Sequence, residues 1–314
     1  MRRLIFLLVR MTALLAGMTV PLHSSAHAMQ GAHHWWTFDP WVVVPLTLYC
    51  ALYLKGVFSM RSKRAALGVI QPGALLGFAA GTAGLFLALI WPLDALGEIS
   101  FAAHMAQHML LIAVAAPLLI VARTSVPVAF ALSGFWPQTF AWFARMRKLF
   151  RVLLRPNVAF AFHGAAIWVW HAPLLFDAAL RWPWLHRIEH VFFLASGMFF
   201  WAALRRAGSA GGDGYGVAAL LTLATLIHTG LLGALITFAP RLIYSSYGAV
   251  DGLPLTPMED QQLAGLIMWI PAGLCYLAAG IGFAAAWLRH AEDGDRRAPG
   301  MPPSSPANAQ HRAR

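Results

Sequence analysis

Charged residues are scarce in this chain. Of its 314 residues only 11% are Asp, Glu, Lys or Arg, whereas 59% are hydrophobic, and the mean hydropathy is +0.64. A soluble globular domain carries about 25% charged residues, because its surface has to face water. The shortage of charge therefore excludes the soluble classes of protein and indicates a polytopic membrane protein.

Cysteine and acidic residues are also few. The two cysteines, Cys50 and Cys275, each lie inside an apolar run and lack the paired spacing of a metal or redox motif. We expect both to be small buried side chains. Acidic residues number 12 against 23 basic ones, which gives a net charge of +11. Because the basic residues form short clusters between apolar runs, they are expected to set membrane topology and not to bind nucleic acid.

Long apolar runs fill most of the chain. Residues 1–28 are typical of a secretory signal sequence, with Arg2 and Arg3 before an apolar run and a small-residue cleavage site at its end; an uncleaved signal anchor is the alternative. The sequence then predicts an all-α bundle of seven transmembrane helices in one domain, residues 29–290, with a disordered tail over 291–314. An uncleaved signal would make eight apolar segments. The seven predicted spans are 40–60, 73–92, 100–122, 157–176, 186–204, 215–239 and 260–288.

Basic residues are distributed unevenly between the two sides of this predicted bundle. With the N-terminus outside and the C-terminus inside, sixteen basic residues fall on inner segments and three on outer loops, as the positive-inside rule requires. The longest inner segment, 123–156, mixes aromatic and basic residues. It is predicted either to form a helix along the inner membrane surface or to be an ordinary solvated loop.

Several apolar runs contain ionisable residues near their outer ends. Ionisable groups inside a membrane are expensive and mark functional sites. The third predicted span reads AHMAQHMLLI, and the fifth opens with HRIEH. The polar residues of this outer layer are His104 and His108 on the third span, His171 on the fourth, His186 and His190 on the fifth, and Asp260 and Gln261 on the seventh.

The spacing of these residues indicates a metal site. Two histidines at i and i+4 project from one helical face and can hold one metal ion. Imidazole suits copper and zinc, and thioether sulfur suits Cu(I), so a site without thiolates that opens to the outside favours copper, with Cu(I) preferred. The candidate metal ligands are His104, His108, His171, His186, His190, Asp260, Met105 and Met109, with Glu189 and Gln261 as supporting polar residues.

Other functions remain open at this point. Two histidines on facing helices could hold haem in an electron carrier. A membrane metal hydrolase is a weaker alternative, because HMAQH has Met105 where a zinc protease has its Glu, and we expect no enzyme activity. A metal-free scaffold for another membrane protein is the third alternative. His163 and His228 are expected to be packing residues that bridge helices.

Four blocks of sequence also resemble a known family. HMAQHMLLIAVAAPLL, WHAPLLFDAAL, HRIEHVFFLASGMFFW and DQQLAGLIMW, within residues 35–288, resemble the CtaG family of polytopic cytochrome c oxidase assembly factors. The resemblance implies a multi-pass protein of the bacterial inner membrane, which matures a haem–copper oxidase at the stage of copper insertion. Its partners would be an oxidase subunit, a periplasmic copper donor and membrane lipid. The copper chemistry itself is supported by the residue types.

Overall fold

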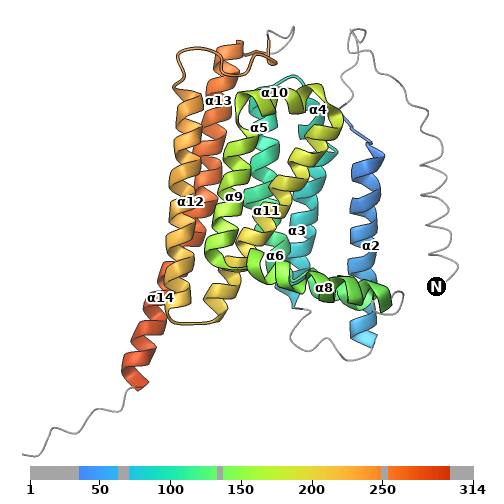
Figure 1. The fold of residues 1–314 in the computed structure, drawn as a ribbon, viewed down its shortest axis with the longest axis vertical. Coiled ribbons are helices and arrows are strands. Elements are labelled where there is room, and N and C mark those ends of the chain that lie inside the picture. Colours follow the sequence, from blue (N-terminus) through green and yellow to red (C-terminus); the bar gives the residue numbers. More distant parts are fainter. Residues whose placement is uncertain (1–34, 63–70, 133–136, 249–253, 298–314) are drawn as a thin grey trace, which may run out of the picture.

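The computed structural model describes residues 35–62, 71–132, 137–248 and 254–297, and within these ranges the protein contains helices and no strands (Figure 1). This confirms the all-α prediction for the described residues. The predicted signal segment, residues 1–28, lies outside them, as do residues 298–314 of the predicted tail.

The described residues form long bundle helices and short connecting ones. Eight of these helices begin with a proline, where the missing N–H has no partner to lose. The elements are α2 (Pro40–Ser62), α3 (Pro72–Leu89), α4 (Leu93–Gly97), α5 (Phe101–Met109), the π-helix η1 (Leu110–Ala115), α6 (Ala116–Val121), α7 (Ser125–Leu132), α8 (Pro137–Leu153), α9 (Pro156–Trp170), α10 (Pro173–Arg181), α11 (Pro183–Ser209), α12 (Asp213–Thr237), α13 (Pro257–Trp269) and α14 (Pro271–Arg297).

Among the described residues, five helical segments are long and apolar enough to cross a membrane, and a bent helix pair raises the number to six. The helix α11 occupies the predicted fifth span but is not among them, because charged residues near both of its ends lower its apolar character. The chain is therefore a multi-pass membrane protein by composition and helix length. The count of seven spans and the orientation of the termini stay predictions.

The C-terminal helix is longer than the sequence indicated. It continues to Arg297, so residues 291–297 of the segment expected to be disordered are helical. Ala, Glu and Arg in this stretch are good helix formers, and the next proline, Pro299, comes only after the helix has ended.

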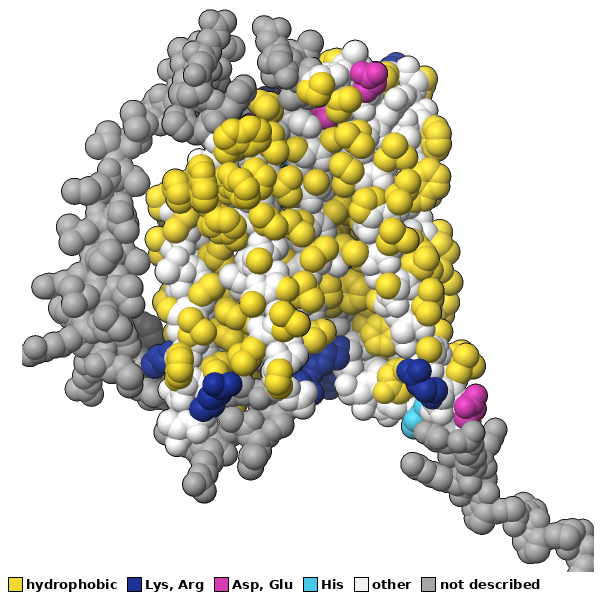
Figure 2. Space-filling model, turned by 180° about the vertical axis from the view of Figure 1, so that it is seen from behind, with side chains coloured by type: hydrophobic (Ala, Val, Ile, Leu, Met, Phe, Trp, Pro, Cys, Tyr) yellow, Lys and Arg dark blue, Asp and Glu magenta, His cyan; other side chains and the backbone are white. Residues whose placement is uncertain are grey.

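The helix α8 crosses one end of the bundle. The axes of Arg145–Leu153 and α9 are bent by 80° from each other, so α8 lies across the bundle helices (Figure 1). Figure 2 shows a broad apolar belt with Lys and Arg side chains at this end. This arrangement favours the surface helix over the solvated loop for the 123–156 segment.

A π-helical turn lies in the central span, directly after Met109. Pro117 follows it and has no N–H to donate to the carbonyl four residues back, which is a common reason for an irregular turn. The indole Nε1–H of Trp201 donates to the carbonyl of Ile112 at 2.9 Å. Gly197 allows α11 to approach this turn closely, because a Cβ there would lie 3.4 Å from the Ile112 Cα. The contact fixes α11 against the third predicted span, residues 100–122. The two candidate histidine pairs lie on these two segments.

Candidate metal centre

The start of α5 is held by a complete set of hydrogen bonds. The Oγ of Ser100 accepts from the backbone N–H of Ala103 at 3.2 Å and donates to a carboxylate oxygen of Asp260 at 2.7 Å. The same carboxylate accepts from the N–H groups of Phe101 at 2.6 Å and Ala102 at 3.2 Å. A carboxylate at a helix N-terminus is favourable because the N–H groups there lack helical partners. Asp260 of α13 therefore positions the helix that carries the first histidine pair.

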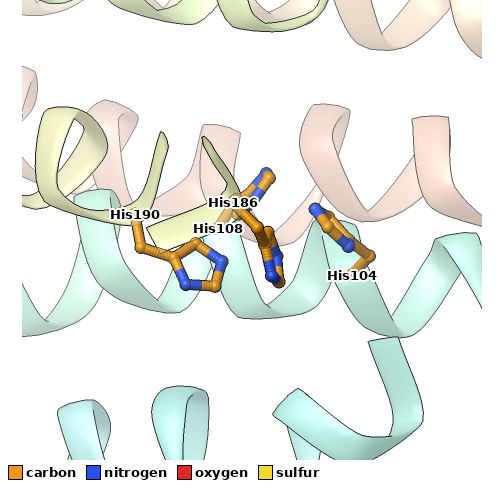
Figure 3. A group of neighbouring side chains, drawn as sticks. All are labelled: His104, His108, His186 and His190. Carbon is orange, nitrogen blue, oxygen red and sulfur yellow. The ribbon is translucent and has the colours of Figure 1, made fainter. Parts of the chain in front are cut away.

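Four histidine side chains meet between α5 and α11 (Figure 3). His104 and His108 project from one face of α5, and His186 and His190 project from the first turns of α11, as their i,i+4 spacing predicts. Each residue offers one ring nitrogen, and these four nitrogens all lie within 4.8 Å of one another. The two predicted pairs thus form one cluster, which we call the four-histidine centre.

Each histidine of the four-histidine centre has a ring nitrogen without a hydrogen-bond partner among the described residues. Within the described residues, Nε2 of each of the four histidines is buried without a hydrogen bond, as is Nδ1 of His108. Buried polar atoms are nearly always hydrogen-bonded, so each exception calls for an explanation. These unpaired nitrogens lie together and can donate lone pairs to a metal ion, so the cluster fits a cation-binding site.

A carboxylate lies beside these imidazoles. Glu189 is fully buried and neither of its oxygens has a hydrogen bond among the described residues. Its Oε1 lies 3.9 Å from Nε2 of His108, which is too long for a hydrogen bond. The sequence indicated that Glu189 lies beside its chain neighbour His190, whereas the fold places it beside His108 of α5. An ionised carboxylate here would offset the charge of a bound cation.

The centre is covered, although the sequence indicated a site open to the outside. His104 and His108 are fully buried, His190 is nearly so, and His186 is partly exposed. The ring of Phe176, from α10, lies edge to face with His104 at 5.2 Å. Tyr247, from the connection after α12, contacts the same imidazole. Aromatic side chains from two connecting segments therefore close this end of the bundle over the histidines.

Tyr247 also determines which nitrogen of His104 carries the proton. Its hydroxyl lies 2.7 Å from the carbonyl oxygen of Gly97 and 3.0 Å from Nδ1 of His104. Burial raises the pKa of the Tyr247 phenol well above its ordinary value of 10.0, so the phenol keeps its proton. Because a carbonyl only accepts, the O–H donates to Gly97 and the oxygen accepts from Nδ1–H. The lone pair of His104 is then on Nε2, within the centre.

The other predicted ligands have different surroundings. Both oxygens of Asp260 are engaged at the start of α5. The side chain of Gln261 accepts from the N–H of Ile243 at 2.7 Å and so holds the connection after α12. His171 lies near the centre, with its ring 6.1 Å from that of His108, and its Nε2 lies 3.3 Å from the sulfur of Met105. Met109 is buried in the hydrophobic core.

His163 and His228, which lie outside the layer, contact neighbouring helices. His163 is fully buried and its ring nitrogens lie 3.1 Å from the hydroxyls of Ser196 and Tyr276, on α11 and α14. His228 accepts from the indole N–H of Trp168 at 3.3 Å. Both rings bridge neighbouring helices, which agrees with the expected packing role.

An apolar groove of 740 Å³ lies between α2 and α11, with side chains of α3 and α6 also in its wall. His190 and Arg187 line this groove together with apolar residues such as Leu46 and Val191. At one end Arg187 forms an ion pair with Asp39, with 2.6 Å between Nε and Oδ2. The groove therefore reaches the four-histidine centre at His190.

Sequence reasoning missed Tyr247, Phe176 and the Asp39–Arg187 ion pair. Tyr247 lies outside the four quoted blocks, Phe176 is one apolar residue among others in WHAPLLFDAAL, and residues 39 and 187 are far apart in the chain. Their contribution depends on how the connecting segments fold back over the bundle.

Replacing Asp260 with alanine should destabilise the protein without removing any residue of the four-histidine centre. The change leaves the donors of Ser100, Phe101 and Ala102 without their acceptor. We expect a loss of at least about 3 kcal/mol in unfolding free energy, because three buried donors are left unpaired and each costs about 1–3 kcal/mol. Thermal unfolding in detergent would measure it. Glu259→Ala, which removes an exposed capping carboxylate one residue away, is the control and should have a smaller effect. A variant of unchanged stability that failed to bind a metal held by the unmodified protein would instead make Asp260 a ligand.

Comparison with known proteins gives an independent result. The family model described as cytochrome c oxidase caa3 assembly factor matches residues 51–290. Uncharacterized proteins of Mycobacterium bovis and Mycobacterium tuberculosis are each 26% identical to this chain over 278 residues, which is 83% of the chain and 40% of each relative. The chain therefore spans about two fifths of the length of these relatives. No solved structure matches it significantly.

Proposed function

This chain belongs to the family of cytochrome c oxidase caa3 assembly factors, and from that premise we propose that it binds copper at the four-histidine centre and delivers it to an oxidase subunit. The family match supports the resemblance that the sequence blocks indicated. The observation that carries the copper proposal is the cluster of buried imidazole nitrogens without hydrogen-bond partners. Copper is the cargo in this proposal and not a permanent cofactor.

The donor set favours copper in its monovalent state. Imidazole nitrogen suits copper and zinc, and the nearby sulfur of Met105 suits Cu(I). A monovalent ion beside one ionised carboxylate, Glu189, gives a centre of zero net charge. A divalent ion would leave one uncompensated positive charge, which is unfavourable at a buried position.

The spacing of the nitrogens fits a single ion. Four nitrogens bound tetrahedrally at about 2.0–2.1 Å lie roughly 3.3 Å apart. The largest separation in the cluster is 4.8 Å, so rotation of the rings by modest amounts would close it. Haem would need an open slot between two axial histidines, whereas here the rings that face each other between α5 and α11 are only 5.1 Å apart at their centres for His104 and His186 and 5.3 Å apart for His108 and His190. The packing favours an ion over a haem.

The apolar groove supplies a route for delivery. His190 lines both the groove and the four-histidine centre. A transmembrane helix of the oxidase subunit that occupies the groove could bring its own ligand to copper at His190, so that the new bond forms before the old one breaks. A lipid chain in the same groove would bring no ligand. We place this exchange at the periplasmic side of a bacterial inner membrane, where a periplasmic donor would load the centre.

Copper analysis of the full chain purified in detergent tests the proposal. The protein is loaded with Cu(I) under reducing conditions, excess metal is removed, and copper per chain is measured. We expect retained copper and an X-ray absorption spectrum dominated by imidazole nitrogen. A chain that folds and retains no copper would contradict the copper function and favour the metal-free scaffold.

Replacing Tyr247 with phenylalanine should weaken copper binding without abolishing it. The change removes the acceptor that holds the proton on Nδ1 of His104, and loss of such a supporting hydrogen bond typically costs roughly 10–100-fold in metal affinity. Competition with a Cu(I) chelator measures the affinity. Tyr276→Phe is the matched control, because it removes a hydroxyl that contacts a histidine outside the centre, His163. Equal affinities for Tyr247→Phe and the unmodified protein would show that the tautomer of His104 is not fixed in this way.

A further inference from the structure

His171 and Met105 form a separate pair of donor atoms beside the four-histidine centre. His171 directly follows α9, and Met105 lies on α5 between the two histidines of that helix. The sulfur of Met105 is fully buried and lies 3.3 Å from Nε2 of His171, which is 3% exposed. Most contacts of a buried methionine are apolar, whereas here a ring nitrogen lies against the sulfur.

The proton of His171 is not between these two atoms. Its Nδ1 lies 2.7 Å from the carbonyl oxygen of Ile167. Because a carbonyl only accepts, Nδ1 carries the proton of the neutral ring and Nε2 carries the lone pair. A thioether sulfur is an acceptor and never a donor. Two lone pairs therefore face each other in a buried position, which is unfavourable unless a cation lies between them.

The alternative is a doubly protonated ring, in which Nε2–H would donate to the sulfur. That form places a full positive charge next to the other imidazoles of the layer, with His108 6.1 Å away between ring centres. A buried charge without an ionic partner is strongly disfavoured. The neutral ring with a free Nε2 is thus the form that the surroundings favour.

The distance between the two atoms fits a shared metal ion. With metal–nitrogen and metal–sulfur bonds of about 2.0 and 2.3 Å, the 3.3 Å separation corresponds to an angle of about 100° at the metal. Imidazole with thioether is a ligand set that favours Cu(I) over zinc. Nitrogen alone, as in the four-histidine centre, discriminates less between the two.

We propose that His171 and Met105 hold a second Cu(I) position, next to the four-histidine centre and loaded through it. This inference rests on the proposed copper function. The side chain of Phe193 lies against the rings of both His108 and His171, at 4.5 and 5.7 Å between centres, and so closes the same pocket from one side. Because both donor residues are buried, copper reaches them by way of His108. The chain then binds two Cu(I) ions, but one zinc ion.

Conservative replacement of Met105 by leucine tests this second position. Leucine has nearly the same volume, so the fold should be kept. The full-length protein in detergent is loaded with Cu(I) or with Zn(II), and metal per chain and the X-ray absorption spectrum are recorded. Met268→Leu is the matched control, because Met268 is equally buried but lies on α13.

We expect two copper ions per chain and a copper–sulfur signal in the unmodified protein and in Met268→Leu. Met105→Leu should hold one copper ion and lose the sulfur signal, and all three proteins should hold one zinc ion. His171→Leu is the second variant and should lose the same copper ion. If the unmodified protein holds one copper ion with nitrogen ligands alone, and Met105→Leu is no different, the second position is wrong while the four-histidine centre stands. A chain that holds no copper would overturn the proposed function itself.

Discussion

Replacing both His104 and His108 with alanine is expected to abolish copper binding. The change removes the whole contribution of α5 to the four-histidine centre and leaves two imidazoles on α11. It also removes His108, through which the second position would be loaded. We expect the affinity for Cu(I) to fall by at least roughly a thousandfold, which is about 4 kcal/mol. Copper per chain after removal of excess metal, together with chelator competition, measures the change.

His228→Ala is the control for this double variant. It also removes a histidine from a helix of the bundle, but His228 contacts Trp168 and lies outside the four-histidine centre. It should keep its copper. A double variant that kept its copper would rule out the α5 pair as ligands. If neither the unmodified protein nor the variant held copper, while the variant still failed to support oxidase assembly, the histidines would serve a metal-free scaffold.

Filling the groove between α2 and α11 is expected to stop oxidase maturation while leaving the copper in place. Val191 lies next to His190, lines the groove and is 64% exposed. A tryptophan at this position would occupy the space where we place the helix of the oxidase subunit. In cells that depend on this chain for oxidase assembly, we expect cytochrome c oxidase activity in membranes to fall at least tenfold. The copper content of the purified variant should not change, because Val191 contributes no ligand.

Leu220→Trp separates this effect from a general disturbance of the membrane surface. Leu220 lies on α12, is 65% exposed and is not part of the groove. The control should support assembly as well as the unmodified chain. Full oxidase activity with Val191→Trp would show that the subunit docks elsewhere. A loss of copper with Val191→Trp would show instead that the groove substitution disturbs the centre itself.

Much of the fold could be predicted because its signals are local. Hydrophobic runs of a given length indicate helices without any knowledge of their neighbours, and prolines at the starts of α3, α9 and α11 mark their first turns. The prediction of a disordered tail was wrong for residues 291–297, where local signals compete. These residues continue α14, although their lack of apolar periodicity indicated disorder.

The candidate site could be predicted in part for the same reason. The i,i+4 spacing places His104 with His108, and His186 with His190, on one face of a helix whatever the rest of the chain does. The sequence also placed Asp260 in the same layer as these histidines. Its carboxylate, however, accepts from N–H groups at the start of α5, which have no helical partners of their own.

Local spacing along the chain is enough to predict that it forms apolar helices and that two of them each carry a pair of histidines on one face. Three further features come from packing between distant segments: α5 and α11 face each other, Glu189 lies beside His108, and the sulfur of Met105 contacts His171. Helix periodicity is set by bonds between residues four apart, so it can be read along the chain. Which helix faces meet depends on side-chain packing between segments far apart in sequence, as at Gly197 and Ile112, and on connections that fold back over the bundle.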